Sequence, residues 1–201
     1  MYEVADRAIK DMNRRNLRAF DKLKQLKFDD LNVFSAVKKT YDDSVRLAKK
    51  RYYQIAYEAY MAALARAKAK KEEEDTITED WVLDMLEEYD PVTLYQFLPE
   101  VERKKQRTIE AIIASHDKAI VIDRALRLWT LQITHYADKS VDKATIDAYK
   151  DAGITKVKWV TADDEKVCKV CRERDGKIYP ITKLPDKPHY RCRCEFWPVL
   201  K

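Results

Sequence analysis

The chain has 201 residues and a net charge of +5; 46% of its residues are apolar, 37% are charged, and only two are glycine. So few glycines disfavour Rossmann folds, P-loops and sheets with many tight hairpins, because these folds need glycine at positive φ or against phosphate. Without tyrosine, the longest apolar runs hold four or five residues, whereas a membrane span takes about 20, and no apolar segment of a secretory signal opens the sequence. We therefore expect a mainly α protein that stays in the cytoplasm.

The net charge is carried entirely by the C-terminal quarter of the chain. Residues 154–201 hold 12 Lys and Arg against 7 Asp and Glu, whereas residues 1–153 hold 28 of each kind. All four cysteines follow residue 160, and Gly153, a residue suited to end a helix, lies at the division. The sequence predicts an elongated helical region over 1–153 and a small module over 154–201.

Two long amphipathic helices are predicted first, over residues 4–26 and 31–74, because apolar residues recur there every three or four positions. Asp29 or Asp30 is the predicted N-cap of the second helix. At 1.5 Å per residue that helix is about 66 Å long. This length exceeds the diameter of a compact domain, so we expect an elongated or broken arrangement.

Shorter helical segments complete this region. A threonine cap followed by acidic residues predicts a helix that ends near Tyr89. Pro91 and Pro99 each stand where a first helical position is expected, which predicts two more helix starts. From Pro99 a long helix is predicted to about Ala137, and a final helix over 141–152.

Tyrosines and histidines of the helical region have two interpretations each. The tyrosines can form a packing surface whose hydroxyls reach water, or a platform on which nucleic-acid bases stack; they stand at Tyr41, Tyr52, Tyr53, Tyr57 and Tyr60. The balanced charge around them favours packing. His116 and His135 have no cysteine nearby, so ordinary surface or core positions are favoured over metal binding.

The C-terminal module carries a metal-ligand pattern. Cys168 and Cys171 have the Cys-x-x-Cys spacing with which a short turn presents two thiolates to one tetrahedral metal ion. Cys192 and Cys194 follow after 20 intervening residues, and His189 stands three positions before Cys192. We expect one structural Zn²⁺, bound by the first two cysteines and by two of the other three residues.

Two disulfides, or four unlinked thiols, are the alternatives to a metal site. A cytosolic chain disfavours disulfides, and unlinked thiols do not explain the pairing at both ends of a short loop. A module of 48 residues is also close to the size at which an unaided core becomes marginal. Structural zinc contributes about 10–16 kcal/mol in small peptides, which is enough to stabilise such a module.

Three short strands are predicted around these ligands, over residues 157–160, 176–180 and 195–199, because their side chains alternate or follow a turn signal. Trp159 and Trp197 are the predicted core of this zinc-bound β-rich module. No catalytic role is expected, and no small-molecule substrate. The His-Glu-x-x-His and nucleobase-deaminase signatures are absent. An HNH-type nuclease needs a general-base histidine besides the metal ligands, and typically an asparagine, and the module lacks both.

The cations of the module are candidate contacts for nucleic-acid phosphates: Lys169, Arg172, Arg174, Lys177, Arg191 and Arg193. Phosphate neutralisation needs little more than well-placed cations, so a regulatory zinc protein that binds nucleic acid is one hypothesis for function. The alternative is that this charge only keeps the module soluble.

A second hypothesis comes from the order of several short motifs, which are Trp159-Val-Thr161, Cys168-x-x-Cys171, Asp175-Gly176 and His189-Tyr-Arg-Cys192-Arg-Cys194. Over about residues 146–199 this order resembles the C-terminal signature of the phage Mu F-like head morphogenesis family, the minor head proteins of tailed phages. Tyr190 stands where the family has proline, and the family's Arg-Thr-Glu step is not evident.

The resemblance implies a virion component, present in few copies inside the head near the portal and in the host cytoplasm during assembly. It implies the portal protein or the major capsid protein as partners, a role in head morphogenesis and in DNA packaging or ejection, and no membrane. The charge division then predicts that the neutral helical region docks on protein while the basic module contacts viral DNA weakly.

Overall fold

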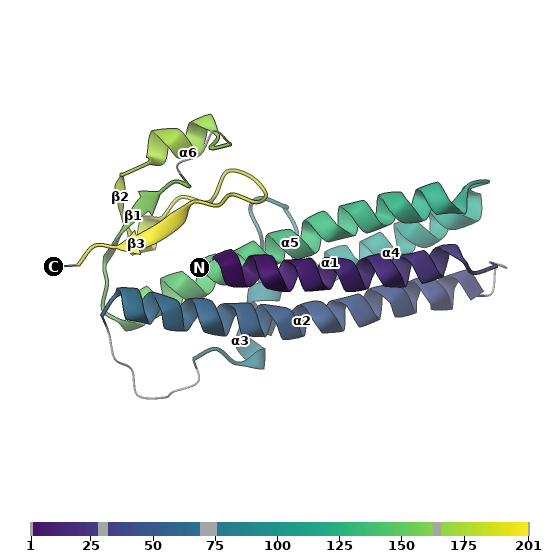
Figure 1. The fold of residues 1–201 in the computed structure, drawn as a ribbon, viewed down its shortest axis with the longest axis horizontal. Coiled ribbons are helices and arrows are strands. Elements are labelled where there is room, and N and C mark those ends of the chain that lie inside the picture. Colours follow the sequence, from purple (N-terminus) through teal and green to yellow (C-terminus); the bar gives the residue numbers. More distant parts are fainter. Residues whose placement is uncertain (1, 28–31, 69–75, 163–165, 201) are drawn as a thin grey trace.

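The computed structural model of the protein describes residues 2–27, 32–68, 76–162 and 166–200. It confirms a mainly α protein in which an elongated bundle of helices leads to a small sheet (Figure 1). The helices in the described residues are α1 (Tyr2–Lys24), α2 (Asn32–Arg66), α3 (Glu79–Glu87), α4 (Phe97–Ala114), α5 (Lys118–Asp151) and α6 (Lys169–Arg174). None of them combines the length and the apolar character needed to cross a membrane.

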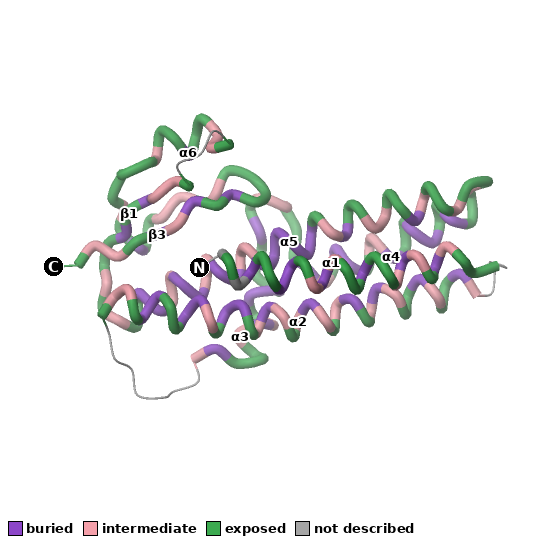
Figure 2. The backbone as a smooth tube through the Cα atoms, in the orientation of Figure 1, coloured by how far each residue is buried: buried purple, intermediate pink, exposed green. Residues whose placement is uncertain are grey.

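The four long helices α1, α2, α4 and α5 lie side by side around an aromatic core. Phe97 stacks on Trp129 with ring centroids 5.8 Å apart, and Tyr41 meets the edge of Trp129 at 5.2 Å. Buried residues concentrate on the facing sides of these helices (Figure 2). The periodic apolar positions therefore form one core, as the helical pattern predicts.

The tyrosines of α2 serve packing, but their hydroxyls differ from the expectation. Tyr41, Tyr52 and Tyr60 are buried. The Tyr52 hydroxyl donates to the Ile133 carbonyl at 2.9 Å, and the Tyr41 hydroxyl shares a hydrogen bond with Thr108 at 3.1 Å. These hydroxyls bond inside the protein, not to water, because a buried hydroxyl needs a partner.

The boundary between α4 and α5 corrects the sequence-based prediction. A single helix from Pro99 to Ala137 is wrong, since α4 ends at Ala114 and α5 begins at Lys118. The Asp117 carboxylate accepts hydrogen bonds from the amides of Ala119 and Ile120 and so caps α5. The sequence does not indicate this break, because no Gly or Pro stands there and the apolar period continues across it.

Two further helix boundaries differ from the prediction. The separate helix over 141–152 is wrong, because α5 is continuous from Lys118 to Asp151 and then stops at Gly153, whose φ is +71°. α2 ends at Arg66 instead of continuing, with a turn at residues 67–68. Asp29, Asp30 and residues 69–74, where the cap and the end of α2 were expected, lie outside the described residues.

The proline steps also behave differently from one another. Pro99 lies in the first turn of α4, where a missing N–H costs no helical hydrogen bond. Pro91 starts no helix. Residues 91–94 form a turn instead, because the buried Asp90 carboxylate accepts hydrogen bonds from the amides of Val92 and Thr93.

Three antiparallel strands form the sheet, in the order β2-β1-β3, as expected for the module. They are β1 (Lys156–Val160), β2 (Ile178–Pro180) and β3 (Glu195–Pro198), and a short 3-10 helix, η1 (Ile181–Lys183), follows β2. Trp159 is fully buried, as predicted, but Trp197 is 46% exposed. The prediction for Trp197 is wrong because Phe196 lies opposite Trp159 and alternation turns the next side chain outward.

The sheet packs against one end of the helical bundle. Arg66 of α2 forms a 2.9 Å ion pair with Glu195 of β3, and its guanidinium lies 4.7 Å from the centre of the Trp197 ring. Lys187 forms a 2.8 Å ion pair with Asp142 of α5. These contacts hold the module against α2 and α5.

Candidate metal centre

Two segments of the module meet at the cysteines. Cys168 and Cys171 lie at the start of α6, which follows β1, and His189, Cys192 and Cys194 lie on the loop that leads into β3. β3 pairs with β1 in antiparallel register. The segment after β1 and the loop before β3 therefore emerge at the same end of the sheet. All five candidate ligands are brought together there.

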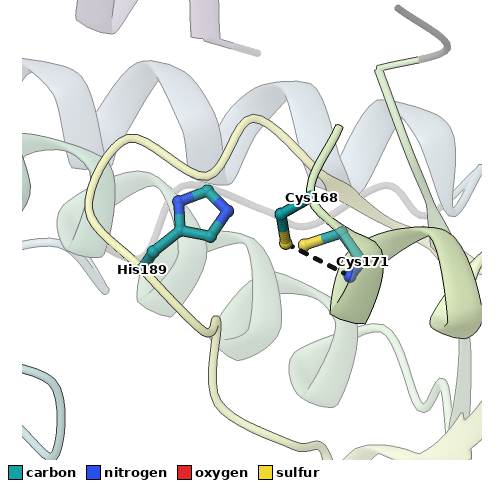
Figure 3. Close-up of side chains that lie close together, drawn as sticks. All are labelled: Cys168, Cys171 and His189. Atoms are coloured by element: carbon teal, nitrogen blue, oxygen red, sulfur yellow. Dashed lines mark hydrogen bonds between the residues drawn. The ribbon is translucent and has the colours of Figure 1, made fainter. Parts of the chain in front are cut away.

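Cys168 is the N-cap of α6. Its sulfur accepts a hydrogen bond from the Cys171 amide across 3.4 Å, as a serine hydroxyl does at other helix starts. The first helical turn then directs the Cys171 thiol to the side of Cys168, and His189 lies across from both (Figure 3). The Cys-x-x-Cys spacing predicts only a short turn here, whereas the structure has the helix α6.

The ligand atoms fall into two groups that share one member. Cys168, Cys171 and His189 form one group, and Cys171, Cys192 and Cys194 form the other; within each, all ligand atoms lie within 4.8 Å of one another. The Cys171 and Cys192 sulfurs are 3.4 Å apart, far longer than the roughly 2.05 Å of a disulfide bond. This arrangement can hold a metal ion, and Cys171 is the ligand that the two groups share.

The hydrogen bond of His189 leaves its other ring nitrogen for a metal. Nδ1 lies 2.8 Å from the Tyr190 carbonyl oxygen, which can only accept, so Nδ1 carries the proton. In the neutral ring Nε2 then keeps its lone pair. Metal-binding histidines commonly have this arrangement, because the carbonyl orients the ring and increases the basicity of the free nitrogen.

The four thiols strongly influence the ionisation of one another. Burial, together with the neighbouring thiols Cys192 and Cys168, raises the pKa of Cys171 to about 12. The hydrogen bond to Cys194, together with burial, raises the pKa of Cys192, whereas that same contact lowers the pKa of Cys194. Without a cation only some of these sulfurs ionise, and a metal ion removes this conflict by stabilising all the thiolates.

A buried indole next to the sulfurs tests whether a metal fits. The Nε1–H of Trp159 is buried and has no hydrogen-bond partner in the described part of the chain. The Trp159 side chain is also one of the groups that lower the pKa of Cys194. A metal-bound thiolate accepts hydrogen bonds well, so this buried donor beside Cys194 and the donor set of the cluster both fit a bound metal ion.

The motif residues outside the ligand set shape the sheet behind the site. The Asp175 carboxylate accepts hydrogen bonds from the amide and the hydroxyl of Thr161, at 2.9 Å and 3.1 Å. The Gly176 amide donates to the Trp159 carbonyl at 2.9 Å, and Gly176 has a φ of +72°. A residue with a side chain is strained at that φ, which gives the Asp-Gly step a physical reason.

The predicted phosphate contacts lie on several elements of the module. Lys169, Arg172 and Arg174 lie on α6, and Lys177 precedes β2. The Arg174 guanidinium donates to the Asp186 carbonyl and lies 5.0 Å from the centre of the Trp159 ring, so it serves the fold.

Two other predicted contacts do lie together. Arg191 and Arg193 are exposed on either side of the buried Cys192, and both line one cavity with Lys166. Arg191 has a φ of +56°, in the left-handed region, so the segment is not extended at this residue.

The chain matches no protein-family model, no curated protein and no solved structure. A functional assignment therefore depends on the chemistry of this cluster and on the order of the motifs around it.

Proposed function

We propose that the cysteine cluster holds one structural Zn²⁺. Thiolates and neutral imidazole are the donors that zinc takes in structural sites. Cys168 and Cys171 supply two ligands, and two of Cys192, Cys194 and His189 supply the others. Because protein atoms fill every position, the metal has no open site for water or substrate. Such a site stabilises the loops around it and carries out no chemistry.

We further propose that the protein is a minor head protein of a tailed phage. The observation that carries this proposal is that the ordered motifs over 146–199 form one unit, in which Trp159, Asp175 and Gly176 support the sheet behind the cysteine cluster. The protein acts in head morphogenesis and in DNA packaging or ejection. It resides inside the head near the portal, and in the host cytoplasm during assembly.

The partner of the helical region is the portal protein or the major capsid protein. The test is to co-express the chain with the portal protein of the same genome and to follow co-migration in gel filtration. Mass spectrometry of purified particles provides the second measurement. We expect a stable complex and a few copies per particle; absence from both would overturn the virion assignment.

We propose that the protein does not hydrolyse nucleic acids. His189 is the only histidine in the described part of the module, and it belongs to the metal cluster. Incubation with duplex and single-stranded DNA in the presence of Mg²⁺, Mn²⁺ or Zn²⁺ should leave both substrates intact. Cleavage that is lost in His189→Ala would contradict a purely structural metal and would favour a nuclease.

The competing hypothesis is a regulatory zinc protein that binds nucleic acid. It is supported by the exposed positions of Arg191 and Arg193 beside one cavity. Binding to one DNA sequence in preference to others, without any association with the portal, would favour this second function.

A further inference from the structure

Residues 1–153 have no net charge, but their positive and negative residues are concentrated in different segments. α1 carries seven Lys and Arg against four Asp and Glu. Residues 79–90, which comprise α3 and the start of the next turn, hold six acidic residues and no basic one. A neutral sum therefore does not exclude polyanion binding, since a ligand responds to the local field at its own face of the molecule.

The cations of α1 form a straight row on its outer face. They recur at intervals of three or four residues, which places them on one side of the helix; the row consists of Arg7, Lys10, Arg14, Arg18 and Lys22. All five are exposed, and α1 presents exposed turns along its length (Figure 2). At 1.5 Å per residue the row is about 22 Å long.

Neighbouring acidic residues leave most of this row unneutralised. Asp11 is held by three arginines, Arg14, Arg15 and Arg51. Asp21 pairs with Lys24 at 2.9 Å. Four cations of the row have no partner among the residues that the structure describes; they are Arg7, Lys10, Arg18 and Lys22.

The row continues into the loop of the metal centre. Arg191 approaches Asp6 of α1 at 3.7 Å, and both side chains are more than half exposed. Asp6 lines one cavity together with Lys166, Arg191 and Arg193. Asp6, which precedes Arg7 at the N-terminal end of the row, thus lies beside the cations of the module.

We infer that the outer face of α1 is a binding site for the phosphate backbone of duplex DNA, continuous with Arg191 and Arg193. Over its two strands duplex DNA carries about one phosphate per 1.7 Å of axis, so a row of about 22 Å laid across the grooves reaches phosphates of both strands. A membrane surface fits less well, because an interfacial helix needs an exposed apolar face. Among the described side chains of α1, Leu17 is the single large apolar one that is exposed, at 48%.

This inference goes beyond the expectation that only the module contacts DNA, and it does not depend on the virion role. The test uses the full-length chain, purified with zinc, and a 30-base-pair duplex labelled with a fluorophore. Binding is measured by fluorescence anisotropy between about 50 and 200 mM salt. In the first variant, Arg7, Lys10, Arg18 and Lys22 are all replaced by Gln, which keeps a good helix former at each position.

The slope of the logarithm of the binding constant against the logarithm of the salt concentration measures how many phosphates the protein neutralises. Loss of four contacts should reduce its magnitude by about 3 to 4, since each contributes about 0.9. The matched control replaces four other cations that are exposed and have no partner in the described residues, and therefore has the same net charge; they are Lys39, Lys50, Lys156 and Lys183. The control should change the slope by less than about 1.

Three outcomes would overturn the inference. An equal change in the two variants would mean that only net charge matters. Loss of binding in a variant with Gln at Arg191 and Arg193, with the α1 variant unchanged, would assign DNA contact to the module alone and leave the proposed function intact. Reduced binding of the α1 variant to vesicles of anionic lipid, with duplex binding unchanged, would make a membrane surface the ligand. Circular dichroism confirms that both variants keep their helices.

Discussion

Tyr149, in the last turn of α5, donates its hydroxyl hydrogen to the main-chain carbonyl of Phe196 in β3 across 3.1 Å. Both residues are buried. β3 is an edge strand of the sheet, so the helix supplies a donor on the side that no strand covers. This bond joins the helical region to the module that carries the metal cluster.

Removing that hydroxyl should weaken the fold. We expect Tyr149→Phe to lower the free energy of unfolding by about 1–2 kcal/mol, because the buried Phe196 carbonyl loses its partner. Urea denaturation followed by circular dichroism measures the change. Tyr57→Phe is the control, since that side chain is 43% exposed, and it should shift stability by less than about 0.5 kcal/mol. Equal effects in both variants would refute the role of this bond.

Asp90, the buried residue before the 91–94 turn, should be highly sensitive to substitution. Its carboxylate holds two amides of the 91–94 turn and lies 2.6 Å from Nε2 of His135, and the residue is 2% exposed. Asp90→Ala leaves a buried histidine and two amides without an acceptor, so we expect a loss of about 3 kcal/mol in unfolding free energy. Asp43→Ala, at an exposed site on α2, should cost far less in the same denaturation assay.

The stability of the protein should decrease as the pH rises toward 8 because of Asp138. Burial, with the nearby Asp142 carboxylate, raises the pKa of Asp138 to about 7, from 3.8 in an unfolded chain. Between these values the folded state holds a proton that the unfolded state has lost. The contribution of this group is therefore complete below about pH 4 and is lost as the pH rises through 7.

Asp138→Asn isolates this effect, because an amide does not ionise. We measure the free energy of unfolding of both proteins by urea denaturation at pH 5 and pH 8. The difference, variant minus wild type, should be larger at pH 8 than at pH 5. Asp43→Asn should follow the wild-type pH profile. Parallel profiles for Asp138→Asn and the wild type would exclude the Asp138 carboxyl as the cause.

Metal content should depend on Cys171 more than on His189. Cys171 belongs to both ligand groups, whereas His189 belongs to one. Metal analysis of protein purified under reducing conditions should find about one zinc per chain. We expect Cys171→Ser to abolish binding and His189→Ala to retain part of it, because five donors are present for four positions. A folded, metal-free module in the wild type would contradict the zinc assignment.

The sequence alone was sufficient where the determining interactions are local. The three-to-four-residue period predicts α1 and most of α2, and alternation predicts β1. The spacing of Cys168 and Cys171 predicts a shared site because a single turn sets the distance between two nearby thiols. Gly153 ends α5 for an equally local reason, its φ of +71°.

Only the tertiary structure decided features that depend on partners far along the chain. Trp159 and Trp197 are alike in sequence, yet the register of β3 on β1 buries Phe196 and exposes Trp197. The turn after Asp90 depends on His135, 45 positions away. The charges of α1 likewise join those of the module only because packing places Asp6 of α1 next to Arg191. Hydrophobic period and ligand spacing are properties of neighbouring residues, whereas register, ion pairing and surface field arise only when distant segments pack.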